Sequence, residues 1–165
     1  MRTLRLVLTG AAVLVVAGLS AVAAPAATSV SVSVKLVEAL KAGPIGREIC
    51  PDIGVDVNCG SGEVRPFGRA TSIVSIGVCG ENCSIRWITL AGGTIVLRES
   101  LSDISCPGAC VTEWPHGAPF RATSTAVMVG GTGDFAGASG ELSGSLAAAA
   151  WEAQITYTGT ITLPS

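Results

Sequence analysis

The stretch of residues 130–140 constrains the fold of this chain more than any other part of its sequence. Five of its eleven residues are glycine, the residue that a backbone needs where φ is positive or where two segments pass close together. Asp134 can hydrogen-bond to nearby amides in such a turn, and Phe135 is the one large apolar side chain there that can enter a core. The stretch therefore predicts an anchored corner between two β-strands. Its structural residues are expected to be Gly130, Gly131, Gly133, Phe135, Gly137 and Gly140.

The same stretch contains a match to the glycine pattern of dinucleotide-binding proteins, in residues 131–136. That pattern indicates a cofactor only where a helix follows the glycines within a βαβ unit. Here Leu142 and Leu146 alternate with Ser143 and Ser145, which is the period of a strand. We therefore expect neither a nucleotide nor any other cofactor.

Alternation of apolar and polar residues recurs along most of the chain. Residues 30–37 and 155–163 show it most clearly, and the second segment places Ile155, Tyr157, Gly159, Ile161 and Leu163 on one face. Further strands are expected at residues 63–78, 84–90, 94–100, 110–114 and 118–129, with a hairpin turn at residues 91–93.

The number and the spacing of these strands predict an all-β fold. About eight strands joined by short turns favour an antiparallel sheet that closes into a barrel, because closure removes exposed edges. Residues 45–62 lack periodicity and are interpreted as a loop or a ragged sheet edge held by a disulfide. The alanines at 147–150 are too few to nucleate a helix between two strand patterns.

The first 23 residues have the three parts of a secretory signal. Arg2 and Arg5 precede an apolar block at residues 6–19, and small residues follow at 21–23. Two of the ten basic residues lie in this segment, so the remaining 142 residues carry eight basic and twelve acidic groups, a net charge of −4. We expect a secreted protein, with residues 24–29 as a flexible leader and residues 30–165 as one barrel domain. Nucleic acid and anionic membranes are unfavourable partners.

The glycine-rich stretch, followed by a strand and then residues 157–163, resembles the C-terminal half of the allene oxide cyclase and dirigent barrel superfamily. It is most similar to small secreted bacterial proteins of unknown role, and residues 68–71 give a weaker second match. The resemblance implies an eight-stranded antiparallel barrel with an apolar interior. Plant relatives cyclise an oxylipin epoxide or orient phenoxy radicals made by a separate oxidase, commonly as trimers. No position here matches their functional residues, so the catalytic residues stay unknown.

The six cysteines predict three disulfides in a secreted chain. Two C-x₃-C segments enclose turn-forming residues, so hairpins there would bring each pair within disulfide reach. The spacing therefore favours Cys50–Cys59, Cys79–Cys83 and Cys106–Cys110. Crossed pairing between the second and third pairs is the competing arrangement, and zinc binding by those four thiolates is a weaker alternative. No metal site is expected.

Other candidate site residues are few. Trp87, Phe120, Tyr157 and Arg121 are candidates for the lining of a ligand cavity, although packing is the usual role of aromatic residues. His116, the one histidine, is interpreted as a surface or packing residue. Arg86, Arg121 and Glu152 are expected to point outward, because a lone buried charge is costly.

These observations favour a secreted, disulfide-stabilised barrel that binds a small apolar molecule or a protein partner without catalysis. The alternative is a cyclase, an isomerase or a stereochemical guide acting in the barrel cavity. An ionisable residue in a perturbed environment inside an open cavity would favour the alternative. A barrel packed solid with side chains would exclude both ligand functions and leave an interaction or structural role. A homo-oligomer is compatible with either function.

Overall fold

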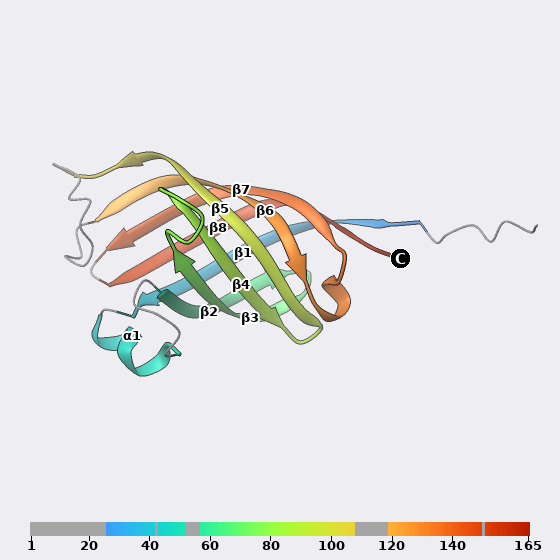
Figure 1. Ribbon diagram of the computed structural model, residues 1–165, viewed down its shortest axis with the longest axis horizontal. Helices are drawn as coiled ribbons and strands as arrows, with labels where there is room; N and C mark the ends of the chain where they lie inside the picture. The colour runs from blue at the N-terminus through green and yellow to red at the C-terminus, as the bar shows by residue number, and fades with distance from the viewer. Residues whose placement is uncertain (1–25, 42, 52–56, 108–118, 150) are drawn as a thin grey trace, which may run out of the picture.

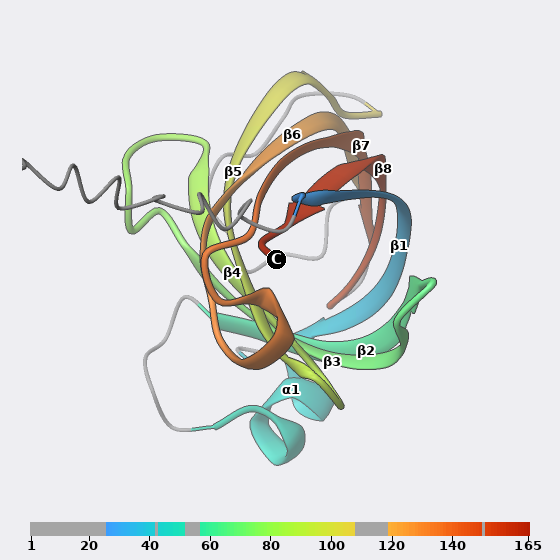
Figure 2. The same cartoon turned by 90° about the vertical axis from the view of Figure 1, so that its right-hand side faces the viewer.

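The computed structural model describes residues 26–165 apart from 42, 52–56, 108–118 and 150. Its strands form one closed antiparallel barrel in which each strand pairs with its neighbours in the sequence and β8 pairs with β1 (Figures 1 and 2). The all-β barrel predicted from the alternation is thus confirmed. The strands are β1 (Thr28–Leu40), β2 (Val57–Arg65), β3 (Gly68–Ile76), β4 (Cys83–Leu90), β5 (Gly93–Ser105), β6 (Phe120–Gly131), β7 (Ser139–Ala149) and β8 (Glu152–Leu163).

The first and last strands close the barrel along an uninterrupted antiparallel register. Thr28 lies opposite Leu163, and the pairing continues to Ala39 opposite Glu152. Ile155, Tyr157 and Ile161 are buried while the threonines between them are exposed, so the predicted faces of this strand are confirmed. Strand β1 begins two residues before the barrel domain was expected to start.

The barrel has two dissimilar ends. The turns β2–β3, β4–β5 and β6–β7 form one of them, which we name the glycine-corner end. The opposite end, which we name the α1 end, carries the short helix α1 (Pro44–Ile49) between β1 and β2 (Figure 1). No helix in the described part of the chain has the length and apolar character needed to cross a lipid bilayer.

The glycine corner turns β6 into β7 through the 3-10 turn η1 (Gly133–Phe135). Phe135 is 2% exposed and meets the ring of Phe67 edge-on, with 5.1 Å between the ring centroids. The corner is therefore anchored in the core as predicted. The side chain that bonds to the neighbouring hairpin is Thr132, where Asp134 was expected: Oγ1 of Thr132 accepts a hydrogen bond from the backbone N–H of Thr94.

The five glycines of the corner differ in why they are needed. Gly133 and Gly137 have positive φ values of 59° and 75°, which other residues rarely adopt. At Gly131 and Gly140 the reason is space, because an added Cβ would collide with a backbone carbonyl oxygen, that of Phe135 or of Thr160 respectively. These four glycines therefore have the structural role that was predicted for them.

Gly130 corrects the expectation that all five glycines are required. It lies within β6, its φ is outside the left-handed region, and a Cβ there would meet only the side chain of Val96, at an ordinary contact distance of 3.7 Å. The register of β5 and β6 shifts beside it, between Val96 and Leu97. Gly130 is thus a strand residue that a small side chain could replace, and the tight corner begins one residue later.

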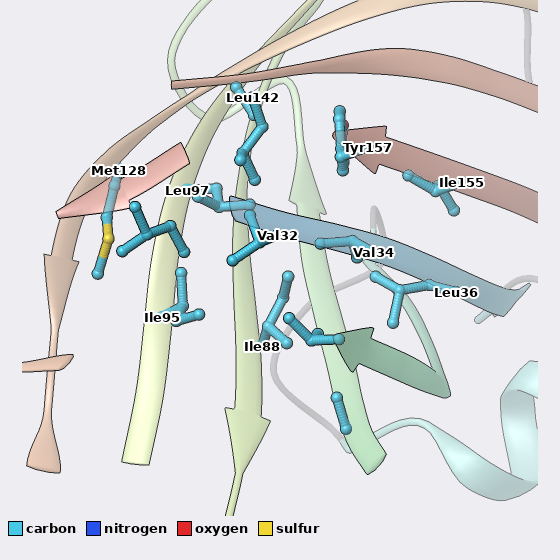
Figure 3. Packing of buried hydrophobic residues seen from close by; sticks show 14 of the residues in the cluster. Val32, Val34, Leu36, Ile88, Ile95, Leu97, Met128, Leu142, Ile155 and Tyr157 are labelled. Atoms are coloured by element: carbon cyan, nitrogen blue, oxygen red, sulfur yellow. The ribbon is translucent and has the colours of Figure 1, made fainter. Parts of the chain in front are cut away.

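Apolar side chains from every strand fill much of the barrel interior. Figure 3 shows Val32, Val34 and Leu36 of β1 on the same side of their strand, with Ile88 of β4 and Ile95 and Leu97 of β5 nearby. Burial of such side chains is worth about 1.5–3 kcal/mol each. The interior is therefore the main source of stability.

Two sequence predictions about local structure are wrong. Residues 63–78 form a hairpin of β2 and β3, because the chain reverses at residues 65–68 where a single bent strand was expected. Residues 45–62 contain α1 and the start of β2, although a loop or a ragged sheet edge was expected. By contrast, β7 runs through residues 147–149 as a strand, and the hairpin turn at residues 91–93 is present.

Two of the three predicted disulfides are present in the described residues. Cys50 and Cys59 have Cα atoms 5.5 Å apart, and those of Cys79 and Cys83 are 5.2 Å apart. Cys106 is also disulfide-bonded, and its predicted partner Cys110 lies outside the described residues. The local pair at Cys79 and Cys83 contradicts both the crossed arrangement and a zinc site made by these two thiolates.

Candidate functional site

A cluster of polar side chains lies inside the barrel, surrounded by the apolar core. Its members come from different strands and are all nearly inaccessible to solvent, with relative exposures of 0–3%. Charged side chains at such depth persist only when they are paired and hydrogen-bonded. We name this group the interior polar cluster; it consists of Glu38 (β1), Ser72 (β3), Arg86 (β4), Glu99 (β5), Ser124 (β6) and Tyr157 (β8).

Arg86 is the centre of the interior polar cluster. Its guanidinium forms a fork with Glu99, in which Nε donates to Oε1 and Nη2 donates to Oε2, the latter at 3.2 Å. Nη1 donates to Oε1 of Glu38 and to Oγ of Ser72, the latter at 2.9 Å. Planar two-point contacts of this kind are the geometry in which arginine binds a carboxylate most strongly. The arginine side chain therefore connects its own strand, β4, to three others: β1, β3 and β5.

Glu38 reaches Ser72 across a glycine. Gly60 of β2 lies opposite Glu38 on one side and opposite Ser72 on the other. The Ser72 hydroxyl donates to Oε1 of Glu38 at 2.6 Å, whereas Oε2 of Glu38 is buried without a hydrogen-bond partner. A Cβ at Gly60 would collide with the backbone of Val37. The glycine is therefore required for the close approach of these strands.

Tyr157 repeats this arrangement on the other side of the barrel. Gly144 of β7 lies between Tyr157 and Ser124 in the strand register, and the two hydroxyl groups are 2.7 Å apart. The Tyr157 hydroxyl also donates to Oε1 of Glu99 at 2.8 Å. Burial raises the pKa of Tyr157 well above its ordinary value, and the negative charge of Glu99 adds to the rise.

The position of Arg86 corrects the expectation that it points outward. Each charged member of the cluster occurs in phase with the apolar face of its own strand: Arg86 with Ile88 and Leu90, and Glu99 with Ile95 and Leu97. Glu38 likewise continues the face of β1 that includes Leu36. This phase was the available sequence signal. The signal is weak for any one strand, because a lone buried charge is unfavourable and the opposite charges that neutralise it lie on other strands.

A hollow of about 540 Å³ lies at the α1 end of the barrel and contains two of the four predicted cavity residues, Phe120 and Arg121. Phe120 is half-buried, and Arg121 is exposed as expected. We name this hollow the rim pocket. Most of its lining is apolar. The lining residues are Ser105, Cys106, Pro107, Pro119, Phe120, Arg121, Ala147, Ala148, Ala149, Glu152 and Gln154.

The other candidate residues are dispersed. Tyr157 is 1% exposed and belongs to the interior polar cluster, whereas Trp87 is 37% exposed on the outer face of β4. The structure therefore does not bring the four predicted cavity residues together. Trp151 is half-buried at the turn between β7 and β8, where it packs against Gly43. Trp114 and His116 lie outside the described residues.

A second hollow of about 530 Å³ lies over β2, β3 and β4, where Arg69 and Thr89 are among its lining residues. Neither hollow has a lining residue from the interior polar cluster. Within the described ranges, no group of three or more His, Cys, Asp or Glu side chains is placed to hold a metal ion.

Comparison with known proteins gives no relative. No protein-family model, no curated protein and no solved structure matches this chain significantly. The comparisons therefore assign no family, and the candidate sites are the interior polar cluster and the rim pocket.

Proposed function

We propose that this protein is a secreted binding protein that holds a small, largely apolar molecule in the rim pocket. The observation that carries the proposal is the pocket itself, whose volume of about 540 Å³ lies within the range of about 300–1,000 Å³ that is usual for small-molecule sites. The predicted signal at residues 1–23 and the disulfides at Cys50–Cys59 and Cys79–Cys83 support secretion.

The lining of the rim pocket suits a molecule with an apolar body and one polar group. Ala147, Ala148 and Ala149 contribute small side chains to the lining, Ala148 from the inner face of β7 and the other two from its outer face, and Phe120 supplies a flat ring. Arg121 and Glu152 are the charged residues of the lining, and both are exposed. Apolar contact supplies most of the affinity in such sites, while a few polar groups fix the orientation.

A pair of matched variants tests the proposal. Ala147→Trp fills the rim pocket from an exposed position of β7, and Ser143→Trp adds the same side chain on the same strand outside the lining. The probe is 1-anilinonaphthalene-8-sulfonate, whose fluorescence increases in apolar surroundings. We expect Ala147→Trp to weaken its binding by about tenfold or more, which corresponds to at least about 1.4 kcal/mol, and Ser143→Trp to leave it unchanged.

Native mass spectrometry of the protein purified from the culture medium of its own host gives an independent test. The proposal predicts a retained small molecule that Ala147→Trp removes. Probe binding that is the same in both variants, together with no retained molecule, contradicts the proposal. A co-purified polypeptide in place of a small molecule would favour a protein partner, for which the exposed Trp87 offers a contact on the outer face.

The chemical groups of the interior polar cluster are the observation behind a second candidate function, isomerisation or stereochemical guidance of a reactive apolar substrate inside the barrel, although the cluster is closed to solvent and lines neither hollow. Arg86, Glu99 and Tyr157 combine a cation, a carboxylate and a hydroxyl group with a raised pKa, as catalytic sites often do. Such chemistry requires the substrate to pass from the rim pocket to the cluster. Tyr157→Phe abolishes turnover of an epoxide substrate if this function is correct, and leaves probe binding at the rim pocket unchanged.

A further inference from the structure

The charges of the interior polar cluster do not balance if both of its carboxyl groups are ionised. Arg86 supplies one positive charge, whereas Glu38 and Glu99 would supply two negative charges. Tyr157 adds none, because its raised pKa keeps the hydroxyl group neutral. An unbalanced charge at 1–3% exposure is strongly unfavourable, and such groups commonly take up a proton instead.

The hydrogen bonds distinguish the two carboxyl groups. Both oxygens of Glu99 accept from the Arg86 fork, and Oε1 also accepts from Tyr157, so three donors stabilise its ionised form. Glu38 accepts only through Oε1, from Arg86 and Ser72, and its Oε2 has no partner. An ionised carboxylate spreads its charge over both oxygens, and a buried oxygen without a donor makes that form costly.

We propose that the interior polar cluster is a proton-binding site, in which Glu38 retains a proton on Oε2 at neutral pH and so makes the cluster electrically neutral. The Arg86–Glu99 fork is then the only full ion pair of the cluster, and the neutral Glu38 accepts hydrogen bonds through Oε1. Loss of the proton places a second negative charge in the barrel interior, with Arg86 as the shared partner of both carboxylates.

In the described structure, no other titratable group near Glu38 supplies the missing positive charge. The groups that face Glu38 from the neighbouring elements of the described structure are Arg86 on β4 and, beyond it, Glu99 on β5 and Tyr157 on β8. Strands β2 and β3 contribute Asn58 and Ser72 to the interior, neither of which titrates. Lys35, on the strand of Glu38, is exposed on the outer face of the barrel.

Glu38→Gln tests the proposal through the pH dependence of stability. A carboxyl group that keeps its proton when folded, but releases it above about pH 4.3 when unfolded, makes the native state bind more protons than the unfolded state. Stability then falls as the pH rises, and the unfolding equilibrium constant increases by up to about tenfold for each pH unit. We expect this slope when the unfolding equilibrium constant of the wild type is divided by that of Glu38→Gln, over part of the range from pH 5 to 9.

Titrating groups other than Glu38 are the same in both proteins, so their contributions to the pH dependence cancel in this ratio of unfolding equilibrium constants. A ratio that is flat from pH 5 to 9 overturns the proposal, because Glu38 would then be ionised in both states. A ratio that depends on the concentration of sodium or potassium ions instead of pH also overturns it, since a monovalent cation would then balance the charge. Glu99→Gln serves as the matched control, and we expect it to lose far more stability than Glu38→Gln at pH 7.

Infrared spectroscopy of the wild-type protein decides the question if Glu38→Gln does not fold. Exposed carboxyl groups are ionised at pH 7, so a carboxylic acid C=O stretching band at that pH reports a protonated buried group. We expect one such band, shifted by ¹³C labelling of glutamate but not of aspartate. Absence of the band at pH 7 overturns the proposal.

Discussion

Replacement of Arg86 by methionine removes the centre of the interior polar cluster while keeping a long apolar side chain. The guanidinium donates to both oxygens of Glu99 and also to Glu38 and Ser72, at 1% exposure. Removal of one partner from a buried ion pair costs about 3–5 kcal/mol, because an uncompensated charge stays behind. That loss is a large part of the total stability of an ordinary domain, which is about 5–15 kcal/mol.

Urea unfolding followed by circular dichroism measures this effect. With a denaturant dependence of about 2 kcal/mol per molar urea, Arg86→Met lowers the midpoint by about 1.5–2.5 M. Arg98→Met, an exposed arginine on β5, is the matched control and changes little. The double variant Arg86→Met with Glu99→Met loses less than Arg86→Met alone, because both charges leave together. If Arg86→Met is as mild as Arg98→Met, the argument for a buried ion pair is refuted.

Three further predictions concern the core, the close strand contact and the single tyrosine. Phe135→Ala is expected to cost about 3–5 kcal/mol in urea unfolding, because the ring is 2% exposed, whereas Phe67→Ala costs less since its ring is only partly buried. Equal losses would argue against the anchoring role of the corner. Gly144→Ala destabilises the barrel, because its Cβ would collide with the carbonyl oxygen of Thr156. Ser143→Ala, on the exposed face of the same strand, does not destabilise it. If the two variants have the same urea midpoint, the close contact at Gly144 is contradicted. Tyr157 is the one tyrosine of the sequence, so tyrosinate absorbance reports it alone. Its pKa is raised on folding, so the stability contributed by its neutral form is present below about pH 10 and lost as the pH rises further. Tyrosinate formation near pH 10 in the folded protein would show that the hydroxyl group is not buried.

The sequence predicted the architecture well wherever a local pattern was sufficient. Alternation fixed the faces of β1 and β8, and the glycines at residues 130–140 predicted an anchored corner with Phe135 in the core. The cysteine spacings predicted three disulfides, of which Cys50–Cys59 and Cys79–Cys83 are present in the described residues. By contrast, the hairpin at residues 65–68 was missed, because Pro66 and Gly68 suit a bend and a reversal equally.

The sequence did not distinguish the individual glycines of the corner. Gly130 and Gly140 look alike in a glycine-rich stretch, yet only Gly140 lies against a carbonyl oxygen of the neighbouring strand, that of Thr160 on β8. Gly137 is needed for its positive φ, which depends on the path of the turn and not on the residue itself. Which glycines a corner requires is therefore decided by the strands that pack around it.

The interior polar cluster could not be predicted from the sequence and became apparent only in the tertiary structure. Ile85 and Trp87 alternate with Arg86 and Ile88 on β4, so apolar residues occur on both faces and the pattern alone does not say which face is buried. Arg86 can turn inward only because acidic partners meet it there: the β4–β5 hairpin brings Glu99, 13 residues away, and the folding of β1 to β4 into one curved sheet brings Glu38, 48 residues away. The sequence by itself therefore determined that a barrel forms. The interior charges are tolerated for a reason that exists only in the folded sheet, where carboxyl groups of β1 and β5 become the partners of one guanidinium.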